Sequence, residues 1–359
     1  MATTACGAGF LLAVAIACYG VLGVGFGAIN ALIFAFQADR VEYGEWRSGV
    51  RGIPSPRRGA GGAARGAGGL RAGGRARMRA EQITDPVAYH GEGPVWSERW
   101  GGLRWVDMLA GDVLSLRPDG GVDRRHVGTV AAALRPRTRA GAVIGVERGF
   151  ALEEPDGTLT TLDELWTDPG VRMNEGGCDP DGRFYCGSMA YDKAPGAAAL
   201  YRLDADRSTR VVLEHVTISN GLDWSPDGSR AYYNDTETHR VDVFDYDRDS
   251  GLTNRRPFAE VSPDDGRPDG LTVDAEGGVW VALNHSGTVR RYTSDGVPDA
   301  VVEVRPRQVT ACTFGGERLD QLYITTSREN LAPGEDPLAG SLFRAEVGVR
   351  GLAVREFAG

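Results

Sequence analysis

From residue 82 onward the chain alternates short hydrophobic and aromatic runs with turn signals, a pattern typical of β-strands joined by tight turns. Three segments share one motif, an acidic residue and glycine followed by an aromatic-rich run: DPDGRFYCGSM (179–189), SPDGSRAYYND (225–235) and DAEGGVWVALN (274–284). The turn glycines of this motif are Gly182, Gly228 and Gly277, so it recurs after 46 and 49 residues.

A repeat of forty-odd residues with several strands in each unit is the sequence signature of a β-propeller. Weaker copies of the turn motif lie in 117–128, 154–162 and 293–302. The region 82–359 has 278 residues, which is the length of six units of about 46 residues. Because this region shows no helical periodicity, we predict an all-β fold, a six-bladed β-propeller.

The N-terminal part of the chain has a different pattern. Residues 1–38 carry no charge, and the apolar run 10–36 is long enough to span a bilayer, so we predict a transmembrane-like helix in a first domain, 1–50. Residues 51–77 contain nine glycines and no acid, which predicts a disordered Gly/Arg linker. The composition changes at Met78, where the predicted propeller domain, 78–359, begins. Met78 is a candidate start of the working protein.

Charge separates the two parts of the chain further. Residues 1–80 contribute +7 to the formal net charge of −9, which leaves −16 for 81–359. An acidic body argues against nucleic-acid binding. We expect the propeller to be cytoplasmic with reduced cysteines, and a membrane tether through 8–37 only if that helix is translated and inserted. Lys193 is the sole lysine, which we attribute to codon usage.

Three segments far apart in the chain each place one oxygen ligand beside glycine. They are HGEGPVW (90–96), SNGLDWSPDG (219–228) and RPDGLTVDAEGG (267–278), and the residues are Glu92, Asn220 and Asp269. Two carboxylates and one amide suit a hard divalent cation and leave coordination positions open for a substrate. Each residue alone is better explained as a turn residue that caps its own backbone, and only the three together favour a metal site.

These segments, together with RMNEGGCDPDGRFYCGSM and VTACTFGGERLDQLYITT, resemble the regucalcin/gluconolactonase (senescence marker protein) family over 82–359. The resemblance implies a six-bladed β-propeller that binds a divalent metal and hydrolyses sugar lactones, although some animal members are described as calcium-binding proteins. The stretch ALIFAFQADRVEYGEWRSGVR (31–51) resembles a loop motif of the glycoside–pentoside–hexuronide:cation symporters. Residues 1–51 are therefore expected to be a fragment of such a sugar symporter.

Carried over by motif, the family resemblance implies Glu92, Asn220 and Asp269 as metal ligands, with Asp269 also the candidate general base. A water activated by the cation is the alternative nucleophile. The same resemblance implies substrate contacts by Arg172 and Asn174, and more weakly by Asp192. The chain departs from the family pattern at Glu175, where aspartate is usual.

The activity implied is metal-dependent hydrolysis of a sugar lactone to the aldonic acid, a hydrolase acting on a carboxylic ester. The cation is calcium, magnesium, manganese or zinc, and oxygen ligands favour the first three. The absence of a GxSxG motif makes a serine hydrolase a poor alternative. The competing interpretation is a non-catalytic calcium-binding propeller of the regucalcin type, in which the same three residues hold a structural ion.

Overall fold

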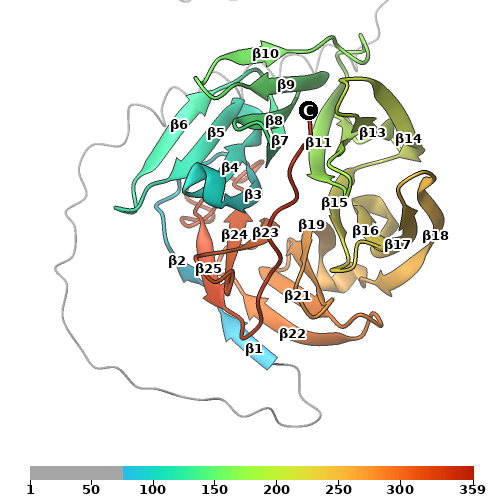
Figure 1. Ribbon diagram of the computed structural model, residues 1–359. Helices are drawn as coiled ribbons and strands as arrows, with labels where there is room; N and C mark the ends of the chain where they lie inside the picture. The colour runs from blue at the N-terminus through green and yellow to red at the C-terminus, as the bar shows by residue number, and fades with distance from the viewer. Residues whose placement is uncertain (1–75) are drawn as a thin grey trace, which may run out of the picture. The chain divides into compact units, whose positions relative to one another are not determined.

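The computed structural model describes residues 76–359, which form a ring of six sheets, the blades, around a central channel (Figure 1). Blade 1 contains β3 (Gly91–Ser97), β4 (Gly102–Asp107), β5 (Asp112–Leu116) and β6 (Val122–His126). Blade 2 contains β7 (Ala131–Pro136), β8 (Ala142–Val146), β9 (Gly149–Glu153) and β10 (Leu159–Thr161). Blade 3 contains β11 (Val171–Cys178), β12 (Phe184–Ala190), β13 (Ala198–Leu203) and β14 (Thr209–Val216). The predicted six-bladed propeller is confirmed.

Blade 4 contains β15 (Ser219–Trp224), β16 (Arg230–Asp235), β17 (Arg240–Asp247) and β18 (Gly251–Glu260). Blade 5 contains β19 (Arg267–Val273), β20 (Val279–Asn284), β21 (Thr288–Tyr292) and β22 (Pro298–Glu303). Blade 6 contains β23 (Val309–Gly315), β24 (Gln321–Thr326) and β25 (Phe343–Glu346). The first strand of each blade lies innermost and lines the channel (Figure 1). Four single-turn 3₁₀ helices lie in connections: η1 (Glu98–Trp100), η2 (Met108–Ala110), η3 (Thr236–Thr238) and η4 (Pro263–Asp265).

Two strands at the start of the described region join the last two blades of the ring. Strand β2 (Glu81–Gln82) pairs with β25 and becomes the outermost strand of blade 6, so the last blade is built from both ends of the domain. Strand β1 (Ala76–Arg79) adds to blade 5 by parallel pairing with β22. Strand β2 thereby gives blade 6 its fourth strand, and the outermost strand of each blade keeps a short open edge.

Strand β1 moves the predicted boundary of the linker. Ala76 and Arg77 were assigned to the disordered linker 51–77, but both lie in β1, opposite Ala300 and Val301. Their backbone groups gain sheet hydrogen bonds, and a composition argument does not detect this because it ignores where the chain passes. The predicted helix in 1–50 and the rest of the linker lie outside the described residues. Within 76–359, no helix has the length and apolar character needed to cross a membrane.

The repeated turn motif occupies one position in three blades. Gly182, Gly228 and Gly277 each lie in the hairpin between the first and second strands, and each has a positive φ, between 75° and 82°. Glycine is the residue that adopts this left-handed conformation without strain. The weaker copies are a different hairpin, because Gly120, Gly157 and Gly296 lie between third and fourth strands.

The hydrophobic core lies between neighbouring blades, where the faces of adjacent sheets meet. Edge-to-face aromatic pairs cross these junctions: Phe150 with Phe184, Tyr185 with Trp224, and Trp280 with Phe314, with ring centroids 5.5–5.9 Å apart. Such pairs contribute beyond the area that they bury. Each blade thus packs against its two neighbours around the ring.

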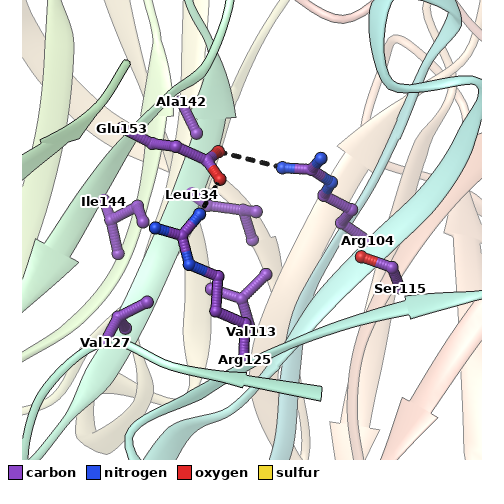
Figure 2. Close-up of a pocket in the computed structure, with 9 residues that line it drawn as sticks. All are labelled: Arg104, Val113, Ser115, Arg125, Val127, Leu134, Ala142, Ile144 and Glu153. Atoms are coloured by element: carbon purple, nitrogen blue, oxygen red, sulfur yellow. Dashed lines mark hydrogen bonds and ion pairs between the residues drawn. The ribbon is translucent and has the colours of Figure 1, made fainter. Parts of the chain in front are cut away.

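One junction keeps a cavity of about 200 Å³ between blades 1 and 2 (Figure 2). Its polar side is an ion-paired triad in which Arg104 and Arg125 both bind Glu153, and apolar side chains of both blades form the remainder. The charged groups in this cavity are already paired with one another. We therefore regard the triad as a clamp between the two blades.

The C-terminal residues 348–359, here called the strap, cross the face of the ring that carries the hairpins between first and second strands (Figure 1). Backbone and side-chain hydrogen bonds tie the strap to all six blades, at Arg99, Pro136, Gly182, Ser225, Ala275 and Leu319. Between the strap and the inner strands lies a cavity of about 60 Å³, lined among others by Arg135, Glu175 and Arg355. The strap therefore covers this end of the channel.

Candidate active site

The inner strands share a backbone irregularity at the end of the channel away from the strap. The pairing register shifts between Glu92 and Val95, Met173 and Gly176, Ser219 and Leu222, and Pro268 and Leu271. These shifts are β-bulges, which bend a strand and re-aim the side chains within it. The predicted ligands Glu92, Asn220 and Asp269 all lie at these bulges.

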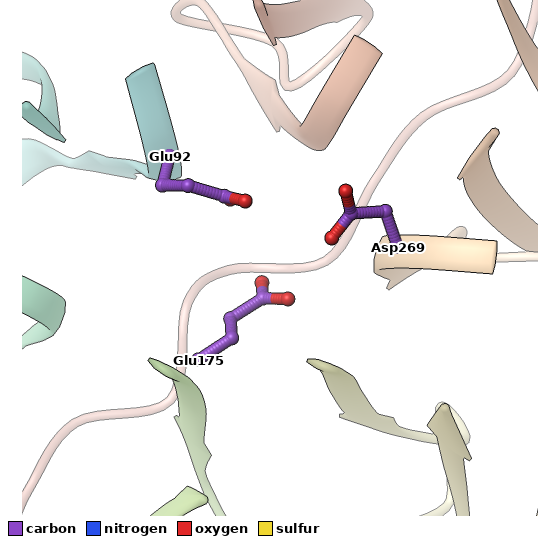
Figure 3. A group of neighbouring side chains, drawn as sticks. All are labelled: Glu92, Glu175 and Asp269. Carbon is purple, nitrogen blue, oxygen red and sulfur yellow. The ribbon is translucent and has the colours of Figure 1, made fainter. Parts of the chain in front are cut away.

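Three carboxylates meet in the channel at the bulges. Ligand oxygens of Glu92, Glu175 and Asp269 lie within 4.8 Å of one another, and each residue is at most 5% exposed. Figure 3 shows the three side chains projecting from separate strands toward a common centre. The sequence predicted two of these acids as ligands and gave the third, Glu175, no role.

Asp269 is held from one side only. Its Oδ2 accepts a hydrogen bond of 2.8 Å from Asn284 Nδ2, and its Oδ1 is buried without a hydrogen-bond partner among the described residues. Burial raises the pKa of Asp269 to about 7, against the hydrogen bond from Asn284. One oxygen is thus oriented by the protein, and the other is left for a ligand.

Glu92 lies beside a buried histidine. Burial, and then the neighbouring carboxylates Asp269 and Glu175, raise the pKa of Glu92 well above its usual range. His90 Nε2 lies 3.8 Å from Glu92 Oε1, while His90 Nδ1 lies 2.7 Å from Ser327 Oγ. Burial lowers the pKa of His90, which favours a neutral ring at this position.

A chain of hydrogen bonds connects the predicted substrate residues to the third predicted ligand. Arg172 Nη1 donates to Asn174 Oδ1 at 2.7 Å, and Asn174 Nδ2 donates to Asn220 Oδ1 at 3.0 Å. Asn220 Nδ2 in turn donates to Thr236 Oγ1 at 2.8 Å. Arg172 Nε is buried without a partner among the described residues, so a donor remains beside the cluster.

The loop between β12 and β13 carries the remaining predicted contact. Asp192 is exposed, and its Oδ1 accepts a hydrogen bond of 3.0 Å from Ala194 N, the turn-capping role of an aspartate. The structure does not bring Asp192 into the carboxylate cluster. The neighbouring Tyr191 ring lies 5.8 Å from the Arg172 guanidinium carbon, which places this loop next to the substrate residues.

Lys193 lies in the same loop, and it is exposed. Its charge lowers the pKa of His90, Asp269 and His285, although it is not the largest cause for any of them. None of the ion pairs within residues 76–359 involves Lys193. Codon usage explains why lysine is rare in this chain, but it does not explain where this single lysine lies.

The donor set fits a divalent cation. Asp269 Oδ1 and Glu175 Oε2 are buried carboxylate oxygens without a hydrogen-bond partner in the described part of the chain, which is a costly arrangement unless a cation or a proton balances them. Oxygen ligands favour calcium, magnesium or manganese over zinc. The described cysteines, Cys178, Cys186 and Cys312, are free and buried, and do not belong to this cluster.

Comparison with known proteins decides the family. The model of the SMP-30/Gluconolactonase/LRE-like region matches residues 90–328. The chain belongs to this family. It is 35% identical over 281 residues to regucalcin of Danio rerio, covering 75% of this chain and 95% of the relative. It is 36% identical over 280 residues to a 6-deoxy-6-sulfogluconolactonase of Pseudomonas putida, covering 75% and 95%.

A solved member of the family has the same fold. The crystal structure of a calcium-binding protein, regucalcin, from Agrobacterium tumefaciens superposes with a TM-score of 0.74 at 27% identity, covering 79% of this chain and 99% of that chain. The family resemblance predicted from the sequence is confirmed. The resemblance of residues 1–51 to a symporter stays a prediction, because the family match begins at residue 90.

Proposed function

We propose that this member of the family hydrolyses a sugar lactone to the aldonic acid, with one divalent cation held by Glu92, Asn220 and Asp269. The observation that carries the proposal is the convergence of buried carboxylates beside the hydrogen-bonded residues Arg172 and Asn174. The similarity to a 6-deoxy-6-sulfogluconolactonase supports lactone hydrolysis as the reaction class. Calcium, magnesium and manganese are the cations that the oxygen donors favour.

A cation held by these residues would supply Lewis acidity toward the lactone carbonyl. The protein supplies orientation. Arg172 and Asn174 are held rigidly in the hydrogen-bond chain, and the free Nε–H of Arg172 is a donor for a substrate hydroxyl or ring oxygen. Asp192 is the outer contact in this proposal, on a loop that covers Arg172 through Tyr191.

Asp269 is the proposed general base. It accepts a proton from the attacking water, whose oxygen bonds to the carbonyl carbon, while the ring carbon–oxygen bond breaks. Asp269 then returns this proton to the departing ring oxygen, which becomes the new hydroxyl, so that lactone and water give one hydroxy acid. Asn284 fixes the orientation of the Asp269 carboxylate through Oδ2, which leaves Oδ1 without a protein donor.

Hydrolysis by the full chain tests the proposal directly. The protein is treated with EDTA, and acid release from glucono-1,5-lactone and other sugar lactones is followed in a pH-stat with calcium, magnesium, manganese or zinc added singly. We expect turnover above the spontaneous rate only after a cation is restored. If cations raise the melting temperature but no lactone is hydrolysed, the proposal is wrong, and the calcium-binding propeller is the better account.

A further inference from the structure

Glu175 projects from the bulge of β11 into the carboxylate cluster, in a position that the predicted ligand set does not include (Figure 3). We propose that Glu175 binds the divalent cation directly, so that the cation is held by three carboxylates. This inference rests on the proposed function for the presence of a cation at the cluster. It does not depend on which reaction, if any, occurs there.

The surroundings of Glu175 leave its carboxylate without a partner in the protein. The side chain is 5% exposed, and no ion pair or hydrogen bond of the described residues reaches it; its Oε2 is fully buried. Its oxygen lies within 4.8 Å of ligand oxygens of Glu92 and Asp269. A buried carboxylate that faces two others and has no donor is balanced either by protons or by a cation.

Asp223 shows what a structural acid looks like in the same channel. It lines the cavity under the strap together with Glu175. Its Oδ1 accepts from Trp224 N at 2.8 Å, and its Oδ2 accepts from Val273 N at 2.9 Å. Backbone amides therefore satisfy Asp223, whereas Glu175 has no such donors and is aimed at the cluster.

The local sequence supports the same assignment. Glu92, Glu175, Asn220 and Asp269 are each followed by glycine, and each lies at a bulge of an inner strand. A Cβ on Gly176 would lie 2.1 Å from the carbonyl oxygen of Tyr185, so only glycine allows β11 to pack this closely after Glu175. The backbone that presents Glu175 is thus built like the backbones that present the predicted ligands.

Removal of a direct ligand changes the hydration of the cation, and removal of a distant charge does not. We therefore use europium(III) as the probe on the full chain, because luminescence lifetimes in H₂O and D₂O count the waters bound to this ion. We expect Glu175→Ala to gain one coordinated water relative to the unmodified chain. Europium affinity should fall on the order of tenfold or more, at least the loss typical of an outer-shell partner.

Asp223→Asn is the matched control, because it removes a negative charge from the same channel. The loss of this charge should weaken europium affinity, because long-range Coulomb attraction is reduced. The number of waters bound to europium should stay unchanged. If Glu175→Ala lowers the melting temperature, Glu175→Gln and Glu175→Asp replace it as test variants. Glutamine keeps the length of the side chain and aspartate keeps the carboxylate. Because an amide is the weaker ligand, Glu175→Gln should bind europium less tightly than Glu175→Asp.

An unchanged water count in Glu175→Ala, with an affinity loss no greater than that of Asp223→Asn, would overturn the proposal. Failure of the unmodified chain to bind europium or manganese would overturn it as well, together with the metal site. Tight binding with the expected change in hydration but without lactone hydrolysis would support Glu175 as a ligand while the proposed function fails.

Discussion

Three buried carboxylates in one place make the stability of this protein depend on pH. Burial raises the pKa of Glu175 to about 8 and that of Asp269 to about 7, and it raises that of Glu92 as well. In the unfolded chain these groups titrate near their ordinary values of about 4. Between the unfolded and the folded pKa values, the folded protein binds more protons than the unfolded chain. The contribution of these carboxyl groups to the free energy of unfolding is therefore fully present below about pH 4 and is lost as the pH rises through 7 to 8.

We expect the melting temperature of EDTA-treated protein to fall between pH 5 and pH 8. Saturating manganese should abolish this fall, because a cation takes the place of the protons and binds only the folded state. Differential scanning calorimetry at several pH values measures both. A melting temperature that rises with pH in the absence of metal would show that the carboxylates do not converge.

Arg172 is expected to act on the substrate more than on the cation. In Arg172→Lys the charge remains, but the planar guanidinium that holds Asn174 and keeps Nε–H free is lost. One hydrogen bond involving a charged group is worth about 1.5–3 kcal/mol, so kcat/KM should fall by roughly 10- to 100-fold.

The control for Arg172→Lys is Arg267→Lys. Arg267 forms an exposed ion pair of 2.9 Å with Glu237, and such pairs contribute little. In steady-state kinetics, kcat/KM of Arg267→Lys should stay near that of the unmodified chain. Manganese affinity should change little in either variant. Equal losses in both variants would contradict the role of Arg172.

At the scale of strands, the sequence predicted the repeat from only three of the six blades. Blades 3, 4 and 5 carry the same glycine turn between their first two strands, and their inner strands begin 48 residues apart, at Val171, Ser219 and Arg267. Blades 1 and 2 begin at Gly91 and Ala131 and are shorter, with 40 residues to the next inner strand. Their first hairpins have other turns, such as the one that contains η1, so the acidic–glycine turn motif does not occur in those hairpins.

The candidate site was predicted in the same partial way. Glu92, Asn220 and Asp269 stand out because each lies beside glycine in a motif matched to the family. Glu175 lies beside glycine too, but it was compared only with the family pattern, where it is a departure. The bulge that directs it toward the other acids is a property of strand pairing between β11 and β12, which the sequence does not display.

The bulge in β11 gives a prediction of its own. In Gly176→Ala the new Cβ would meet the Tyr185 carbonyl oxygen at 2.1 Å, so the strand must shift and Glu175 must move with it. We expect the free energy of unfolding to fall by about 1–3 kcal/mol, as for overpacking in a core. Manganese affinity, measured by calorimetry, should fall as well.

Gly128→Ala is the comparison for this variant, because the nearest atom to its new Cβ would be 3.7 Å away. Denaturant unfolding of the two proteins should separate them clearly. Similar stability and similar manganese affinity in both would show that the close approach of β11 to β12 is not required.

For the whole molecule, the strap connects the C-terminus to the stability of the ring. Phe357 is fully buried in the core of blades 1 to 3, and its backbone pairs with Pro136. Phe357→Ala should cost about 3–5 kcal/mol of unfolding free energy, measured by chemical denaturation. Val297→Ala, at a side chain that is 58% exposed, should have little effect, and an equally small effect at Phe357 would mean that the strap is not packed.

The sequence did not predict how the two N-terminal strands join the ring, and the reason is again strand pairing. The strands β1 and β2 lie next to each other in the chain but belong to different blades, and each pairs with a strand more than 200 residues away. Short pairings of this kind depend on where the ring brings the ends together. Composition alone therefore placed Ala76 and Arg77 in the linker.

The measurement that tests the central claim most directly is lactone hydrolysis by Asp269→Asn in the presence of manganese. The variant keeps the shape of the side chain and its neighbour Asn284, so it should fold, which a thermal melt verifies. We expect acid release from glucono-1,5-lactone to fall by at least the 10²-fold or so that general-base catalysis contributes, while the unmodified chain turns over only with the cation. Unchanged turnover in folded Asp269→Asn would contradict the account, because the reaction would then occur without the residue on which both metal binding and proton transfer depend.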